Sequence, residues 1–110
     1  MAISEFRYNK KTKHYSYIFS KKGDYRKNIL ISTKSKRKKK RKNGTYKEYD
    51  NIPLYKHPNP RTPNEKAYLI PKIESTHKDS FGRELRSWKF HNNDKRIVKR
   101  IKKGKIKKSL

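Results

Sequence analysis

A run of basic residues in the middle of the chain limits the possible folds more than any other feature. Eight of the nine positions from Lys34 to Lys42 are Lys or Arg, and Ser35 is the exception. Charges this close together repel one another and cannot be buried without partners, so the run must stay in solvent. The chain has 110 residues, enough for one small domain. We therefore predict a long basic loop over 34–49 inside a single domain that spans 1–110.

The charge of the whole chain indicates the class of partner. With 34 Lys and Arg against 9 Asp and Glu, the formal net charge is +25, and nine of the cations lie between Lys95 and Lys108. Each cation placed on a phosphate releases condensed counterions, so a polyphosphate gains most from such a surface. We expect a nucleic acid as partner, RNA more than DNA, and no membrane and no cofactor. A host nucleoprotein or the ribosome is an alternative partner.

The apolar pattern before the basic run predicts a hairpin over 14–33. Aromatic residues alternate with other residues from 14 to 19, which is the period of a half-buried strand, and the stretch 25–33 is β-branched and apolar at its centre. Gly23 lies between the two stretches and favours a turn.

After the basic run, Asn43 and Gly44 predict a turn, and a proline-rich strap without helix is expected over 50–66. Strands and a C-terminal helix are expected over 67–103, followed by a basic tail over 104–110. In this region 67–73 reads as a third strand, in which Pro71 indicates an edge or a bulge. We further predict a turn at 81–82 and a short fourth strand at 88–90.

The helix is expected to begin after an N-cap at Asn93 or Asp94 and to end near Gly104, with Ile97, Val98 and Ile101 on one face. The predicted fold is therefore α+β, with a small antiparallel sheet of about four strands and a C-terminal helix. The expected core is Ile18, Phe19, Ile29, Ile31, Leu69, Ile73, Phe81, Trp88, Phe90, Ile97, Val98 and Ile101.

Candidate contacts to nucleic acid come from the basic loop, the strap and the helix. Phosphate contacts are predicted from Lys34, Lys36, Arg37, Lys38, Lys39, Lys40, Arg41, Lys42, Arg61, Lys72, Lys78, Arg83, Lys99, Arg100 and Lys103. Aromatic side chains near the loop can stack on unpaired bases, and the candidates are Tyr46, Tyr49 and Tyr55.

Metal chemistry is not expected, because the four histidines show no metal-ligand spacing and carboxylates are scarce. RNA can still be cleaved without a metal when its 2′-hydroxyl attacks the adjacent phosphorus, given a general base and a general acid. His57 on the strap and His77 after the third strand are the candidate catalytic residues. The sequence leaves open the choice between a binding protein and a metal-independent endoribonuclease.

Five short motifs carry a resemblance to a known group of proteins. They are HPNP (57–60), AYLIPK (67–72), FG (81–82), WKF (88–90) and DKRIVKRI (94–101). With these motifs the chain resembles small basic proteins of Gram-positive phages and mobile elements. In size and charge it is similar to RelE-like and barnase-like ribonuclease toxins, which implies an α+β fold with a curved antiparallel sheet. The expected order of elements differs from the RelE type, so no catalytic residue is carried over.

A phage origin would also suit a third function, the inhibition of a host nucleoprotein such as a defence complex. The chain has no Cys and no long apolar stretch, and its first residues lack the apolar centre of a signal peptide. A cytoplasmic location is therefore expected.

Overall fold

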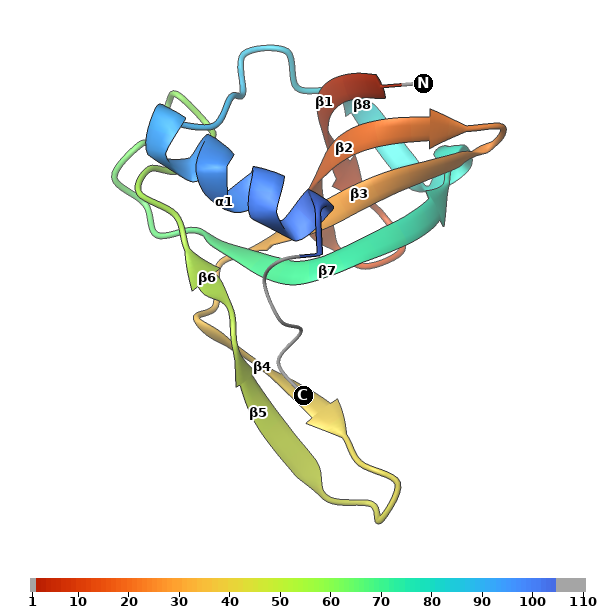
Figure 1. Ribbon diagram of the computed structural model, residues 1–110. Helices are drawn as coiled ribbons and strands as arrows, with labels where there is room; N and C mark the ends of the chain where they lie inside the picture. Colours follow the sequence, from red (N-terminus) through yellow and green to blue (C-terminus); the bar gives the residue numbers. More distant parts are fainter. Residues whose placement is uncertain (1, 105–110) are drawn as a thin grey trace.

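The computed structural model describes residues 2–104, which form a mostly β-sheet domain with one C-terminal α-helix (Figure 1). The elements, in chain order, are β1 (Ala2–Asn9), β2 (His14–Lys22), β3 (Tyr25–Ser32), β4 (Lys36–Lys40), β5 (Tyr46–Asp50), β6 (Ile52–Pro53), β7 (Tyr68–His77), the 3-10 turn η1 (Lys78–Ser80), β8 (Phe81–Glu84) and α1 (Asn92–Lys102). None of the helical segments in this range is long and apolar enough to span a membrane.

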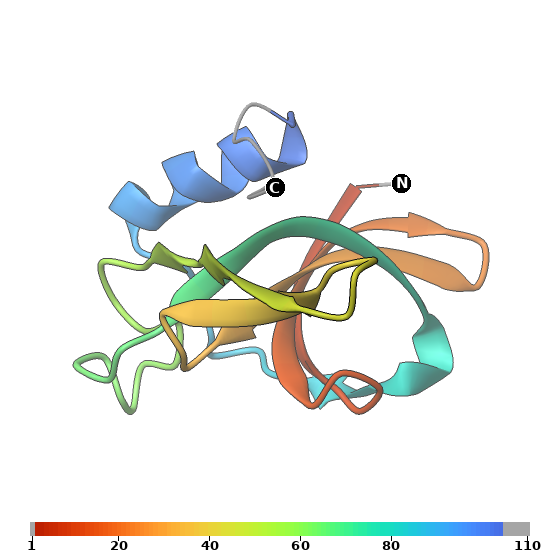
Figure 2. The ribbon, with the colours of Figure 1, turned by 90° about the horizontal axis from the view of Figure 1, so that it is seen from below.

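Six strands form one antiparallel sheet in the order β6-β7-β3-β2-β1-β8. The sheet is strongly curved, and α1 lies across one side of it (Figure 2). The turn η1 leads from the end of β7 to β8, which pairs with β1 at the other edge. Backbone hydrogen bonds hold this connection, because Lys78 N–H donates to Asp24 O at 2.8 Å and Lys10 N–H donates to Ser80 O at 2.7 Å.

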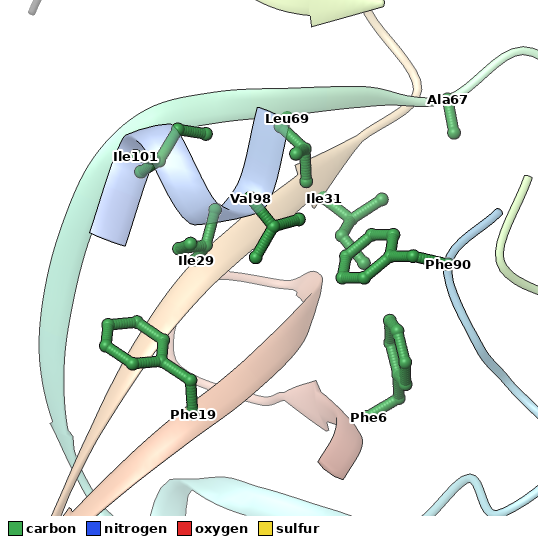
Figure 3. Close-up of a cluster of buried hydrophobic side chains, with 9 residues drawn as sticks. All are labelled: Phe6, Phe19, Ile29, Ile31, Ala67, Leu69, Phe90, Val98 and Ile101. Carbon is green, nitrogen blue, oxygen red and sulfur yellow. The ribbon is translucent and has the colours of Figure 1, made fainter. Parts of the chain in front are cut away.

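The core lies between α1 and the face of the sheet that it covers (Figure 3). Val98 and Ile101 are the buried apolar residues of α1, one helical turn apart, and they pack towards β3 and β7. The buried cluster consists of Phe6, Phe19, Ile29, Ile31, Ala67, Leu69, Phe90, Val98 and Ile101.

The strap between β6 and β7 is fixed to the first turn of α1 by Asp94. This side chain is 1% exposed. Its carboxylate accepts the backbone N–H of Tyr55 at 2.7 Å and that of Lys56 at 3.2 Å. Further along the strap, Lys89 N–H donates to Pro58 O at 3.2 Å. The strap therefore packs against the helix although it has little regular structure of its own.

The prediction of about four strands is wrong, because the main sheet has six and a separate pair is formed by β4 and β5. The first strand was missed, although Phe6 and Tyr8 alternate with Glu5, Arg7 and Asn9, and Phe6 lies in the buried cluster. The predicted strand at 88–90 is irregular instead. The turn expected at 81–82 is the beginning of β8.

Several local predictions are confirmed. The hairpin over 14–33 is β2 and β3, and Gly23 has a φ of +58° in its turn. Pairing of β7 with β3 is irregular between Ile29 and Ile31, opposite Pro71, as expected for a proline without a backbone donor. The helix begins slightly earlier than predicted, with His91 as N-cap, and Gly104 after its end has a φ of +70°. The tail beyond Gly104 lies outside the described residues.

Of the expected core, Ile73 is wrong, because it is 36% exposed on β7. Ile18 and Phe81 are buried outside the cluster beneath α1. Trp88 and Ile97 are partly buried against that cluster rather than inside it.

Candidate nucleic-acid interface

The basic run is an antiparallel hairpin and not a loop, which corrects the prediction for 34–49. The hairpin of β4 and β5 projects away from the main sheet (Figure 1). Its register runs from Lys36 opposite Asp50 to Lys40 opposite Tyr46. Asn43 and Gly44 form the tip as predicted, with Gly44 at a φ of +85°. Eight of the ten strand residues are exposed, so the hairpin has no core of its own.

One face of the hairpin carries acidic residues in register with its lysines. Residues directly opposite each other in an antiparallel pair share a face. Lys36 is opposite Asp50 and Lys38 is opposite Glu48. Lys36 Nζ also lies 4.0 Å from Glu48 Oε2. We call this side of the hairpin the mixed face; it consists of Lys36, Lys38, Lys40, Tyr46, Glu48 and Asp50.

The other side, which we call the basic face, consists of Arg37, Lys39, Lys47 and Tyr49. Arg37 is opposite Tyr49 and Lys39 is opposite Lys47, so no acidic residue is in register on this face. Two cations lie over the Tyr49 ring, with Arg37 Cζ and Lys47 Nζ each 5.5 Å from its centroid. Two lysines opposite each other destabilise a ribbon that has no core. An anion bound on this face would offset that repulsion.

The base of the hairpin is held by the buried Asn51. Its Nδ2 donates to Lys34 O at 3.0 Å, and its Oδ1 accepts Arg37 Nη1 at 2.7 Å. Its backbone N–H donates to Ser35 O at 2.8 Å. Beside this anchor lies a groove of about 480 Å³, lined in part by His14, Lys34, Lys36, Arg37 and Lys38. The base of the hairpin is therefore fixed by hydrogen bonds and lies beside a groove that several basic residues line.

The remaining predicted phosphate contacts are spread over other elements. Arg61 lies on the strap and Arg83 on β8, and both are exposed. Lys72 on β7 has Nζ 3.3 Å from Glu74 Oε1. Lys78 in η1 has Nζ 3.5 Å from Asp24 Oδ1. The predicted phosphate contacts therefore do not form one continuous surface with the hairpin.

The basic residues of α1 divide into two stripes. At 100° per residue, positions four and seven apart lie on the same side of a helix. Lys99 belongs to one stripe with Lys95 and Lys102. Arg100 and Lys103 belong to another with Arg96. The prediction grouped Lys99 with Arg100 and Lys103, and it missed Lys95 and Lys102.

The three tyrosines predicted to stack on bases also separate. Tyr46 and Tyr49 are on β5, and Tyr46 is 65% exposed. Tyr55 lies on the strap, where its ring centroid is 4.6 Å from that of His91. Of these three tyrosines, Tyr46 and Tyr49 belong to the hairpin and Tyr55 does not.

The two candidate catalytic histidines are not brought together. The strap that carries His57 runs beside Ala67, just before β7, whereas His77 is the last residue of that strand. A strand of ten residues is about 30 Å long. Each histidine accepts a backbone N–H at Nδ1, His57 from Asn59 at 3.0 Å and His77 from Asp79 at 3.2 Å. Each Nδ1 atom therefore accepts a hydrogen bond that stabilises the local turn.

Burial lowers the pKa of His57, and the nearby Glu65 opposes this effect. The pKa of His14, in the groove at the base of the hairpin, is lowered by burial and by Lys34. Both imidazoles are therefore mostly neutral at pH 7. Neutral His57 fits the hydrogen bond that its Nδ1 accepts.

These shifts predict that the melting temperature falls as the pH is lowered through the ordinary histidine value of 6.5. With a lower pKa in the folded state, the unfolded chain binds more protons in this range, so stability rises with pH. Thermal melts between about pH 5.5 and 7.5 should show this slope. The double variant His14→Gln, His57→Gln should have a flatter profile. A double variant as pH-dependent as the wild type would contradict the assignment.

Two residues of the candidate interface were not named from the sequence. Lys47 lies outside the continuous basic run, and the cross-strand register places it on the basic face. Nothing in the sequence distinguishes Asn51 from other loop asparagines, because its three contacts depend on the fold.

Within residues 2–104, no group of three or more His, Asp or Glu side chains is placed to hold a metal ion. Comparison with protein-family models, with curated proteins and with solved structures finds no match to this chain.

Proposed function

We propose that the protein binds single-stranded nucleic acid, RNA in preference to DNA, and that the β4–β5 hairpin holds the phosphates. The observation that carries this proposal is the basic face, where Lys39 and Lys47 lie opposite each other on a ribbon without a core. Two like charges directly opposite each other repel and destabilise such a ribbon. Phosphates along the face would turn the repulsion into attraction and release counterions.

Two tyrosines favour a single strand over a duplex. Tyr49 has Arg37 and Lys47 near its ring, and the exposed Tyr46 is on the opposite face of the same strand. Aromatic rings between cations can stack on bases that are not paired, and they do so without strong sequence preference. Sequence-specific RNA recognition uses unpaired bases in the same way. The stripe of Arg96, Arg100 and Lys103 on α1 supplies further phosphate contacts.

The ribonuclease alternative has less support, because His57 and His77 lie at opposite ends of β7. Cleavage would need a base and an acid on the two sides of one phosphate. The inhibition of a host nucleoprotein has no geometric feature of its own.

The proposal is tested by fluorescence anisotropy with labelled single-stranded RNA, single-stranded DNA and duplex DNA of equal length. We expect the tightest binding to single-stranded RNA, with a slope of log K against log salt of about −0.7 per phosphate contacted. The RNA is then examined on a gel after incubation in EDTA. Intact RNA supports binding, whereas fragments with 2′,3′-cyclic phosphate ends would support the nuclease. Absence of binding to all three at physiological salt would overturn the proposal.

A further inference from the structure

A second depression lies between α1 and the sheet, away from the hairpin. It measures about 440 Å³ and is lined by residues of β1, β2, α1 and the segment 84–90. Four aromatic rings contribute to its wall. The ring centroids of Phe6, Tyr17 and Phe90 are within 5.1 Å of one another, and Trp88 lies 6.0 Å from Phe6.

Tyr17 and Trp88 are the rings of this wall that a ligand can reach. Phe6 and Phe90 are 4% and 6% exposed, so they form the floor, whereas Tyr17 and Trp88 are only partly buried. Two further rings pack against Trp88, because its ring centroid lies 4.6 Å from that of Tyr15 and 5.4 Å from that of His57. The single Trp of the chain is therefore a supported aromatic surface beside an open pocket.

Cations border the same pocket. Lys95, Lys99 and Lys102 line it from α1, and all three are exposed. They follow one side of the helix over about 10 Å. Lys102 Nζ lies 5.2 Å from the centroid of the Phe19 ring, which places its charge over the apolar side of the sheet. The pocket therefore combines aromatic walls with the three lysines of α1, and Glu5 and Glu84 also line it.

We infer that this pocket holds one unpaired base of the bound strand, stacked on Trp88 and Tyr17, while the adjoining phosphates follow Lys95, Lys99 and Lys102. The volume lies in the range of small-molecule sites, about 300–1,000 Å³. The aromatic walls suit a planar ring. The three lysines of α1 favour a ligand that carries negative charge, although Glu5 and Glu84 line the same pocket. A nucleotide within a strand has both properties. This inference rests on the proposed function and adds a base-binding site to the phosphate-binding hairpin.

The experiment compares a single-stranded RNA oligomer with an abasic oligomer of the same length, which has the phosphates but no bases. Binding is followed by anisotropy of an end label and, separately, by the fluorescence of Trp88. We expect both oligomers to bind and only the one with bases to quench Trp88. A base stacked in the pocket should by itself make the oligomer with bases bind about fivefold to 150-fold more tightly, and stacking on Tyr46 or Tyr49 would add to this.

A pair of matched triple variants tests the rim. Lys95→Gln, Lys99→Gln, Lys102→Gln removes the stripe at the pocket, and Arg96→Gln, Arg100→Gln, Lys103→Gln removes an equal charge from the other stripe. Circular dichroism checks that both keep their helix. The first variant should reduce the preference for the oligomer with bases. The second variant should weaken the binding of both oligomers by the same factor, so that the preference for the oligomer with bases is unchanged.

The outcomes separate this inference from the proposed function. If neither oligomer binds, the proposed function fails. If the oligomers bind but the one with bases does not quench Trp88, phosphate binding by the hairpin stands and the base pocket is wrong. A short acidic peptide with an aromatic residue serves as a competing probe. Quenching of Trp88 by this peptide, with none by RNA, would assign the pocket to a protein partner and overturn the inference.

Discussion

Replacing Asp94 by Ala is expected to lower the free energy of unfolding by about 3 kcal/mol. The buried carboxylate accepts two backbone N–H groups from the strap, and the variant would leave both donors without an acceptor. Asp94→Asn should cost less, because its Oδ1 can still accept one of the two. Urea unfolding followed by circular dichroism measures the change.

Asp79→Ala is the matched control, since it removes the same charge from a side chain that is 81% exposed. We expect this control to stay within about 0.5 kcal/mol of the wild type. Equal stability of the two variants would show that the contact between the strap and α1 contributes little to the fold.

Replacing residues 36–50 by a two-residue Asn-Gly turn is expected to remove most of the salt dependence of RNA binding and to leave the main sheet folded. The replacement is geometrically possible, because Ser35 and Asn51 already face each other through a 2.8 Å backbone hydrogen bond. For a single strand, each lost phosphate contact reduces the slope of log K against log salt by about 0.7. Binding isotherms at four or five salt concentrations give the slope for both proteins.

Two double variants of equal charge show which face of the hairpin is responsible. Lys39→Gln, Lys47→Gln changes the basic face, and Lys36→Gln, Lys38→Gln changes the mixed face. The first pair should flatten the slope more, because the lysines of the mixed face already lie opposite Asp50 and Glu48. An equal loss from both pairs would mean that charge alone, without the arrangement on two faces, determines binding. An unchanged slope in the hairpin-deleted protein would remove the hairpin from the interface.

The elements predicted correctly from the sequence are those whose apolar residues have the spacing of a strand or helix and are also buried in the fold. Ile29 and Ile31 lie at the centre of a β-branched stretch, and Val98 and Ile101 have helical spacing, so their burial could be foreseen. The first strand has a short alternation of Phe6 and Tyr8 with Glu5, Arg7 and Asn9, which was not recognised as a strand pattern. Its strand character depends on backbone pairing with β2 and β8.

The basic hairpin was missed for a different reason. Lysine is disfavoured in strands, and the run has no apolar residue to reveal a period of two. The turn at Asn43 and Gly44 was recognised, however, and the stretches on its two sides could have been tested as pairing partners. The separation of His57 from His77 depends on the path of the strap and the length of β7. Neither can be read from residue spacing alone.

The hairpin contributes no side chain to the buried cluster, and Asn51 with the backbone around it anchors its base. Substitutions near its tip therefore carry little penalty for folding of the rest of the chain. If the hairpin binds as proposed, its binding preference can change during evolution while the sheet stays constant, and the sheet can serve as a scaffold on which other hairpins are grafted.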